Sequence, residues 1–138
     1  MILKPIKKEI WQFYAICDSS QSCPLLTWLG TIPKDQRASA KKLLAIIYKA
    51  SGDRHGPLLL SKDVCHRVND KHAINEFIAG KLRLLWFYSP TEKKVIICSV
   101  GFRKKTQKTP KKLIDAAVRD KKSYIEAVNN NDIKILED

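Results

Sequence analysis

The chain has 138 residues, of which 44% are apolar, and its 26 Lys and Arg against 14 Asp and Glu give a net charge of +12. This composition excludes a disordered chain, and the length suits one domain with its own core. No stretch is long enough to span a membrane, and the first residues lack the apolar segment and cleavage site of a signal peptide. We therefore expect a cytoplasmic protein with an anionic partner: a nucleic acid, an acidic protein or an anionic membrane surface.

The first part of the chain predicts a strand followed by two helices. Residues 1–9 form a short basic lead in this interpretation. Residues 11–17 are aromatic and branched and end at a polar stretch, which is typical of a strand. Helices are predicted over residues 23–29 and over residues 33–52, from the position of the prolines and from apolar residues at helical spacing. The short connection between them predicts an antiparallel helical hairpin that packs on a sheet.

The second part predicts a loop, three strands in a meander and a last helix. The loop covers residues 53–71, and Leu58 to Leu60 are expected to anchor it in the core. The predicted strands span residues 72–78, 81–88 and 94–103. The last helix begins at a Thr109 cap with Pro110 at its first position, and its apolar series is amphipathic.

These elements predict one α+β domain over residues 1–138, with a core over about residues 11–128 and a short acidic tail that is expected to fray. Its architecture is a small antiparallel sheet with an N-terminal helical hairpin and a C-terminal helix. The four cysteines form no C-x-x-C pair, and no histidine stands at zinc-finger spacing from two of them. We therefore expect reduced thiols, no disulfide, no metal and no cofactor.

A basic cluster follows the last predicted strand. Residues 93–112 contain eight Lys or Arg and no Asp or Glu, which is two thirds of the net charge. The eight are Lys93, Lys94, Arg103, Lys104, Lys105, Lys108, Lys111 and Lys112. Any one of these lysines is simplest to explain as a solvated surface charge. The whole set, with no acid to offset its repulsion, favours a polyanion as partner.

The pairing of the last two strands predicts where the arginines meet. If the apolar faces of the two strands lie together, paired residue numbers sum to about 184. Arg83 then lies opposite Gly101, which leaves room for another backbone, and Lys81 lies opposite Arg103. This register puts Lys81, Arg83 and Arg103 on one face, and guanidinium groups are well suited to bind phosphate.

Two segments closely resemble the RelE/ParE superfamily of toxins from toxin–antitoxin modules. They are FIAGKLRLLWFY, residues 77–88, and VIICSVGFRKKTQKTPKKLIDAA, residues 95–117. A strand that ends in G-F-x-K-K-x-x-K-T-P before a helix is the hallmark of the phage-derived, HigB-like branch, and residues 101–110 have this pattern. Phe13-Tyr14, residues 23–29 and Glu76-Phe77 also resemble that branch, so the similarity extends roughly from Trp11 to Val128.

The resemblance implies a RelE-like fold and a ribosome-dependent mRNA endonuclease that inhibits translation without a metal or a cofactor. In such toxins the 2′-hydroxyl of the RNA attacks the adjacent phosphate, and preorganised guanidinium groups stabilise the anionic transition state. Arg83 matches the arginine that holds the phosphate, and Arg103 matches the arginine near the leaving group. The residues expected to be catalytic are Arg83, Arg103, Lys81 and Lys105. Those expected to bind RNA or the ribosome are Lys93, Lys94, Lys104, Lys108, Lys111 and Lys112.

The sequence departs from the RelE pattern at the residues that move protons. Ile74 and Glu76 stand near the positions of a lysine pair, Thr109 stands near a tyrosine position, and no histidine follows His72. The general base is therefore open among Lys81, Lys104, Lys105, Lys108 and Glu76. Tyr124 belongs to the apolar series of the last helix, so we interpret it as a core residue.

Two other functions fit the same features. A non-catalytic member would bind RNA, the ribosome or a gyrase-type target through its basic face, with a steep salt dependence. A protein of the membrane surface ranks below this, because the apolar stripe of the last helix is better explained by packing on the sheet. The resemblance also implies an acidic antitoxin, of the helix-turn-helix type, that covers the basic face.

Overall fold

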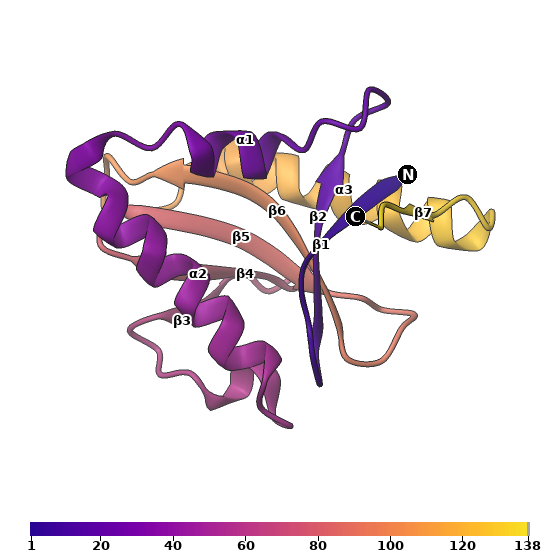
Figure 1. The fold of residues 1–138 in the computed structure, drawn as a ribbon, viewed down its shortest axis with the longest axis horizontal. Coiled ribbons are helices and arrows are strands. Elements are labelled where there is room, and N and C mark those ends of the chain that lie inside the picture. The colour runs from indigo at the N-terminus through magenta and orange to yellow at the C-terminus, as the bar shows by residue number, and fades with distance from the viewer. Residues whose placement is uncertain (138) are drawn as a thin grey trace.

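The computed structural model describes residues 1–137, which form a seven-stranded mixed sheet and three α-helices (Figure 1). The strands are β1 (Ile2–Lys8), β2 (Gln12–Cys17), β3 (Cys65–Asn69), β4 (Ile74–Ala79), β5 (Leu82–Tyr88), β6 (Val95–Arg103) and β7 (Lys134–Ile135). The helices are α1 (Pro24–Gly30), α2 (Arg37–Ser51) and α3 (Lys111–Asn129), and short 3-10 turns span Lys34–Gln36 and Gly56–Leu59. The α+β class is therefore as expected.

The sheet is mixed and not purely antiparallel. Its strand order is β3-β4-β5-β6-β2-β1-β7, and the β2–β6 and β1–β7 pairs are parallel. Three of its strands lie where the sequence predicted none: β1 replaces the basic lead, β3 lies in the predicted loop, and β7 lies in the predicted tail. The sequence of β1 contains a proline and three lysines and therefore does not resemble a strand. It nevertheless pairs with β2, with a bulge next to Pro5.

Helices cover both faces of the sheet. Leu25 of α1 and Leu43 of α2 pack with Trp86 on one face, whereas Tyr124 of α3 packs with Phe87 on the other. Because both faces are buried, β5 is an almost continuous apolar run. Tyr124 is a core residue, as predicted, and its hydroxyl lies 2.7 Å from Ser89 Oγ.

The N-terminal helical hairpin is not present in residues 1–137. The chain begins with two strands, α1 packs mainly on β6 and β2, and α2 packs mainly on β4 and the Gly56–Leu59 turn. Ile32, in the connection, is buried in the core and anchors the turn between the helices. Leu58 and Leu59 do not anchor the following segment, since Leu58 is 82% exposed, but Leu60 packs against the core.

Cys17 and Cys23 form a disulfide, so the expectation of four reduced thiols is wrong. The polar turn between them brings the two Cα atoms to 4.0 Å, and the Asp18 carboxylate accepts hydrogen bonds from the backbone N–H groups of Ser20 and Ser22. Cys65 and Cys98 are free, and burial raises the pKa of the Cys65 thiol to about 11.

The acidic tail is paired through β7, which lies beside β1, while Asp138 is outside the described residues. Within residues 1–137, no helix combines the length and the apolar character that crossing a membrane requires. The start of β5, the end of β6 and the segment in front of α3 meet at one end of the sheet, where most of the basic cluster lies.

Candidate functional site

A β-bulge decides where the two arginines point. From Trp86↔Cys98 to Tyr88↔Ile96 the strands pair as predicted, but a bulge between Leu84 and Trp86 moves the register by one residue. Arg83 then pairs with Phe102 and Arg103 pairs with Leu82. Because a shift of one residue moves side chains to the other face, Arg83 lies on the α3 side and Arg103 on the α1–α2 side. The prediction that they share a face is wrong.

Gly101 also has a different role from the predicted one. A Cβ atom at this position would lie 2.4 Å from the ring of Trp28 and 2.9 Å from the Leu25 side chain. The missing side chain thus makes room for α1 and not for an approaching backbone.

The end of the sheet nevertheless collects the predicted catalytic residues around one cavity of about 650 Å³. We call this cavity the basic cleft. Its cationic side chains are Lys81, Arg83, Arg103, Lys104 and Lys105, and no acidic residue lines it. The Lys104 N–H donates to the Lys81 carbonyl over 2.7 Å, which holds the two chain segments together.

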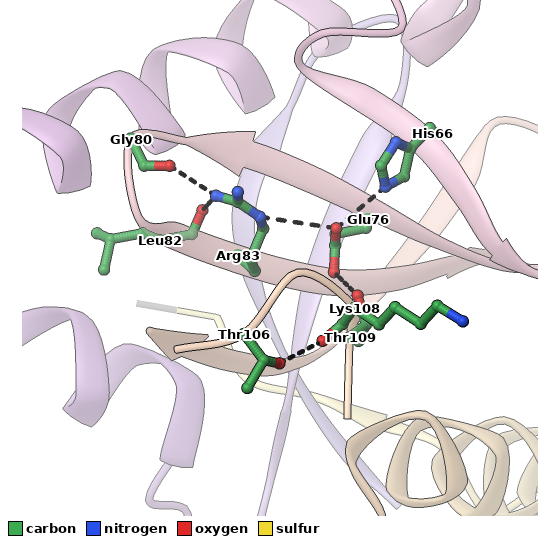
Figure 2. Close-up of polar contacts among 8 residues, drawn as sticks. All are labelled: His66, Glu76, Gly80, Leu82, Arg83, Thr106, Lys108 and Thr109. Carbon is green, nitrogen blue, oxygen red and sulfur yellow. Dashed lines mark hydrogen bonds and ion pairs between the residues drawn. The ribbon is translucent and has the colours of Figure 1, made fainter. Parts of the chain in front are cut away.

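Arg83 is the most firmly fixed cation of the basic cleft. Its Nη1 donates to the carbonyls of Gly80 and Leu82, over 2.7 and 2.9 Å, and its Nε lies 3.7 Å from Glu76 Oε1 (Figure 2). The side chain is only 9% exposed. Within the described part of the chain no group accepts a hydrogen bond from Nη2, so this nitrogen keeps its donors for a ligand.

The carboxylate of Glu76 is the centre of a second group of polar residues. It is 3% exposed, lies 3.1 Å from His66 Nε2 and accepts a 2.6 Å hydrogen bond from Thr109 Oγ1 (Figure 2). Thr109 is therefore not the cap of α3, since Pro110 takes that position. These residues line a cavity of about 330 Å³, which we call the His66 cavity. Arg83 and Lys104 line both cavities, so the basic cleft and the His66 cavity lie next to each other.

Residues 27–122 match the protein family described as Phage derived protein Gp49-like. The match spans 96 of the 138 residues and includes all residues that line the two cavities. The chain belongs to the Gp49-like family. This is a family of type II toxins related to the RelE-like toxins, in agreement with the resemblance found in the sequence. No curated protein matches the chain.

The lysines predicted to bind RNA fall into two sets in this Gp49-like fold. Lys104 and Lys108 line the cavities, and Lys111 and Lys112 are exposed at the start of α3. Lys93 and Lys94 are exposed in the β5–β6 hairpin, at the other end of β6. The nine residues of β6 separate the sets by about 25–30 Å, since a strand rises about 3.3 Å per residue.

Sequence reasoning missed His66, because residues 65–69 were predicted to be a loop. The sequence of this segment, CHRVN, lacks the apolar and polar alternation of a half-buried strand, so no pattern in it marks His66. In the β3–β4 pair His66 lies directly opposite Glu76, so their side chains share a face. Over residues 1–137, three or more His, Cys, Asp or Glu side chains do not gather into a candidate metal site.

Proposed function

We propose that this Gp49-like protein is the toxin of a type II toxin–antitoxin module, in the HigB-like branch, and that it cleaves mRNA on the ribosome. The observation that carries the proposal is the setting of Arg83. Its guanidinium is fixed by two carbonyls and a carboxylate, has no hydrogen-bond acceptor at Nη2 among residues 1–137, and lies between two cavities. Such a fixed cation stabilises a phosphorane more than the ground-state phosphate, because the phosphorane carries more negative charge.

The proposed reaction uses the RNA as its own nucleophile. The 2′-oxygen bonds to the adjacent phosphorus while the bond from phosphorus to the 5′-oxygen breaks, which leaves a 2′,3′-cyclic phosphate and a 5′-hydroxyl. Arg83 and Arg103 approach the phosphate from opposite faces of the sheet end, and this suits them to different oxygens. Lys81 and Lys105 line the same cleft, and in the proposed reaction one of them donates a proton to the departing 5′-oxygen.

The second set of lysines supports a large polyanion as partner. Lys93 and Lys94 lie about 25–30 Å from the cleft, which is too far for a few nucleotides bound there but not for ribosomal RNA. Together with Lys104, Lys108, Lys111 and Lys112 they would position the protein in the ribosome while the cleft holds mRNA. An acidic antitoxin of the helix-turn-helix type would neutralise the toxin by covering the basic cleft.

The position of Glu76 favours an alternative function, in which the protein binds its target without cleaving RNA. A buried carboxylate 3.7 Å from Arg83 offsets part of the charge that a phosphate would meet. A protein that only binds RNA, the ribosome or a gyrase-type target tolerates this better than an enzyme, because binding spreads over many cations. Salt-dependent binding without any RNA cleavage would favour this alternative.

The test is a cell-free translation reaction in which the mRNA cuts are mapped by primer extension. Arg83→Lys and Arg103→Lys keep the net charge but lose the planar, bidentate donor. Each should reduce cleavage by about 10²-fold or more. Arg37→Lys, on the exposed side of α2, is the matched control and should cut like the wild type. Undiminished cleavage by both cleft variants would refute the assignment of these arginines.

A further inference from the structure

We infer that His66, in the cavity next to the basic cleft, is the general base of the proposed reaction, and that Glu76 is the positioning residue that orients its ring. The inference rests on the proposed RNA cleavage and adds to it the residue that removes the 2′-proton. No histidine is among the general bases that the sequence suggests.

The position of Glu76 is fixed from three directions. His66 of β3, Arg83 of β5 and Thr109 in front of α3 all contact its carboxylate, at 3.1, 3.7 and 2.6 Å. A carboxylate held in this way holds its histidine partner in turn. Glu76 is itself 3% exposed with its oxygens occupied, so it is poorly placed to reach a ribose.

The hydrogen bond also decides which nitrogen of His66 is available. A carboxylate accepts hydrogen bonds, so the neutral ring carries its proton on Nε2 and keeps a lone pair on Nδ1. In the described residues no group bonds to Nδ1. The His66 side chain is 43% exposed and lines the His66 cavity, so a ligand in that cavity can reach it. This is the arrangement that a general base requires.

The two cavities place the base beside the phosphate site. Arg83 and Lys104 line both of them, so a phosphate bound at Arg83 puts its neighbouring ribose within the His66 cavity. His66 Nδ1 then accepts the 2′-proton as the 2′-oxygen bonds to phosphorus. The bond to the 5′-oxygen breaks, and that oxygen takes a proton from the Lys105 ammonium. His66 then releases the proton to water, and Lys105 takes a proton from water.

Several charged groups surround His66. Glu76 faces it from β4, Arg83 from β5, and Lys104 and Lys108 from the loop in front of α3. Arg67 is its neighbour on β3 and points to the other face of the sheet, toward Asn75. Histidine is the side chain that normally changes charge between about pH 5 and 8, so the cleavage rate should rise with pH in that range.

The test measures single-turnover cleavage of ribosome-bound mRNA from about pH 5 to 9. His66→Gln should reduce the rate by about 10²-fold or more and remove the rise in rate below pH 8. Glu76→Gln should reduce the rate less than His66→Gln does, because an amide oxygen still accepts a hydrogen bond from Nε2. It should also shift the pH range in which the rate rises. His55→Gln, at an exposed histidine outside both cavities, is the matched control and should keep the wild-type profile.

Rescue separates proton transfer from a structural role. His66→Ala leaves space in the His66 cavity, and added imidazole should restore part of its cleavage, an effect that a merely structural histidine would not show. A His66→Gln variant with the wild-type rate and pH profile would overturn the inference and leave the proposed function standing. A wild-type protein that cuts no mRNA at any pH would overturn both.

Discussion

Thr109 and Glu76 lie 33 residues apart in the chain, and Thr109 Oγ1 donates a 2.6 Å hydrogen bond to Glu76 Oε2. The bond ties the segment in front of α3 to the middle of the sheet. Thr106 Oγ1 donates to the Lys108 carbonyl over 2.8 Å within the same segment. Both Thr109 and Glu76 stand near positions where the sequence is expected to depart from the RelE pattern. The two departures are thus linked, because each residue supplies the partner of the other.

Replacing Thr109 by Val keeps the shape of the side chain and removes the donor. We expect the free energy of unfolding to fall by about 1.5–3 kcal/mol, since a buried carboxylate loses a hydrogen bond. Thr109→Ser keeps the hydroxyl and should cost much less. Urea unfolding of the two variants measures the difference, and equal stability would show that the bond contributes nothing.

The lysines that line the basic cleft and the His66 cavity should dominate the salt dependence of RNA binding. Replacing Lys104, Lys105 and Lys108 by Ala should weaken binding and reduce the slope of log K against log salt by about 2, because each phosphate contact to single-stranded RNA contributes about 0.7. Lys41, Lys42 and Lys49 are exposed on α2, and their triple Ala variant loses the same charge. If both triple variants lose the slope equally, net charge and not the cleft explains binding.

Asp120 should make the protein less stable as the pH rises above about 4. Its burial raises the pKa of the carboxyl above its ordinary value of 3.8, although the 2.5 Å hydrogen bond from Ser99 Oγ opposes this. The folded state then binds the proton more tightly than the unfolded state, so stability falls as pH passes from the ordinary value to the raised one. Asp120→Asn should remove this fall. Unfolding at a series of pH values tests it, and an unchanged decline in the variant would contradict it.

The Cys17–Cys23 disulfide closes a short loop, so reducing it should have a modest effect. With a separation of six residues, loop entropy predicts a loss of about 2 kcal/mol when it opens. Unfolding with and without reductant measures this loss. The double variant Cys17→Ser, Cys23→Ser should not respond to reductant, and a response of equal size would assign the effect to another cause.

The sequence predicts those elements whose apolar pattern is strong. The positions of β2, β5, β6 and α1 to α3 follow from runs and stripes of apolar residues, and the register between Trp86 and Cys98 is as predicted. The collection of Lys81, Arg83, Arg103 and Lys105 around one cavity also follows from the strand ends. These features depend on local periodicity, which a single sequence contains.

The remaining features depend on contacts between distant segments. A one-residue bulge next to Leu84 leaves no mark in the apolar pattern, yet it sends Arg83 and Arg103 to opposite faces. The contact of His66 with Glu76 requires β3. This strand lies at the edge of the sheet and is polar, so its sequence resembles that of a loop. The disulfide depends on a turn geometry that the spacing of the cysteines does not specify.

The proposed reaction of the cleft is attack of the RNA's own 2′-hydroxyl on the adjacent phosphate. The most direct measurement uses an mRNA with a single 2′-deoxy nucleotide at the mapped cut site, in the translation reaction with the wild-type protein. We expect cleavage at that site to disappear while ribosome binding is unchanged, and we expect the unmodified mRNA to yield 2′,3′-cyclic phosphate ends. Cleavage at the deoxy site at the normal rate would contradict it.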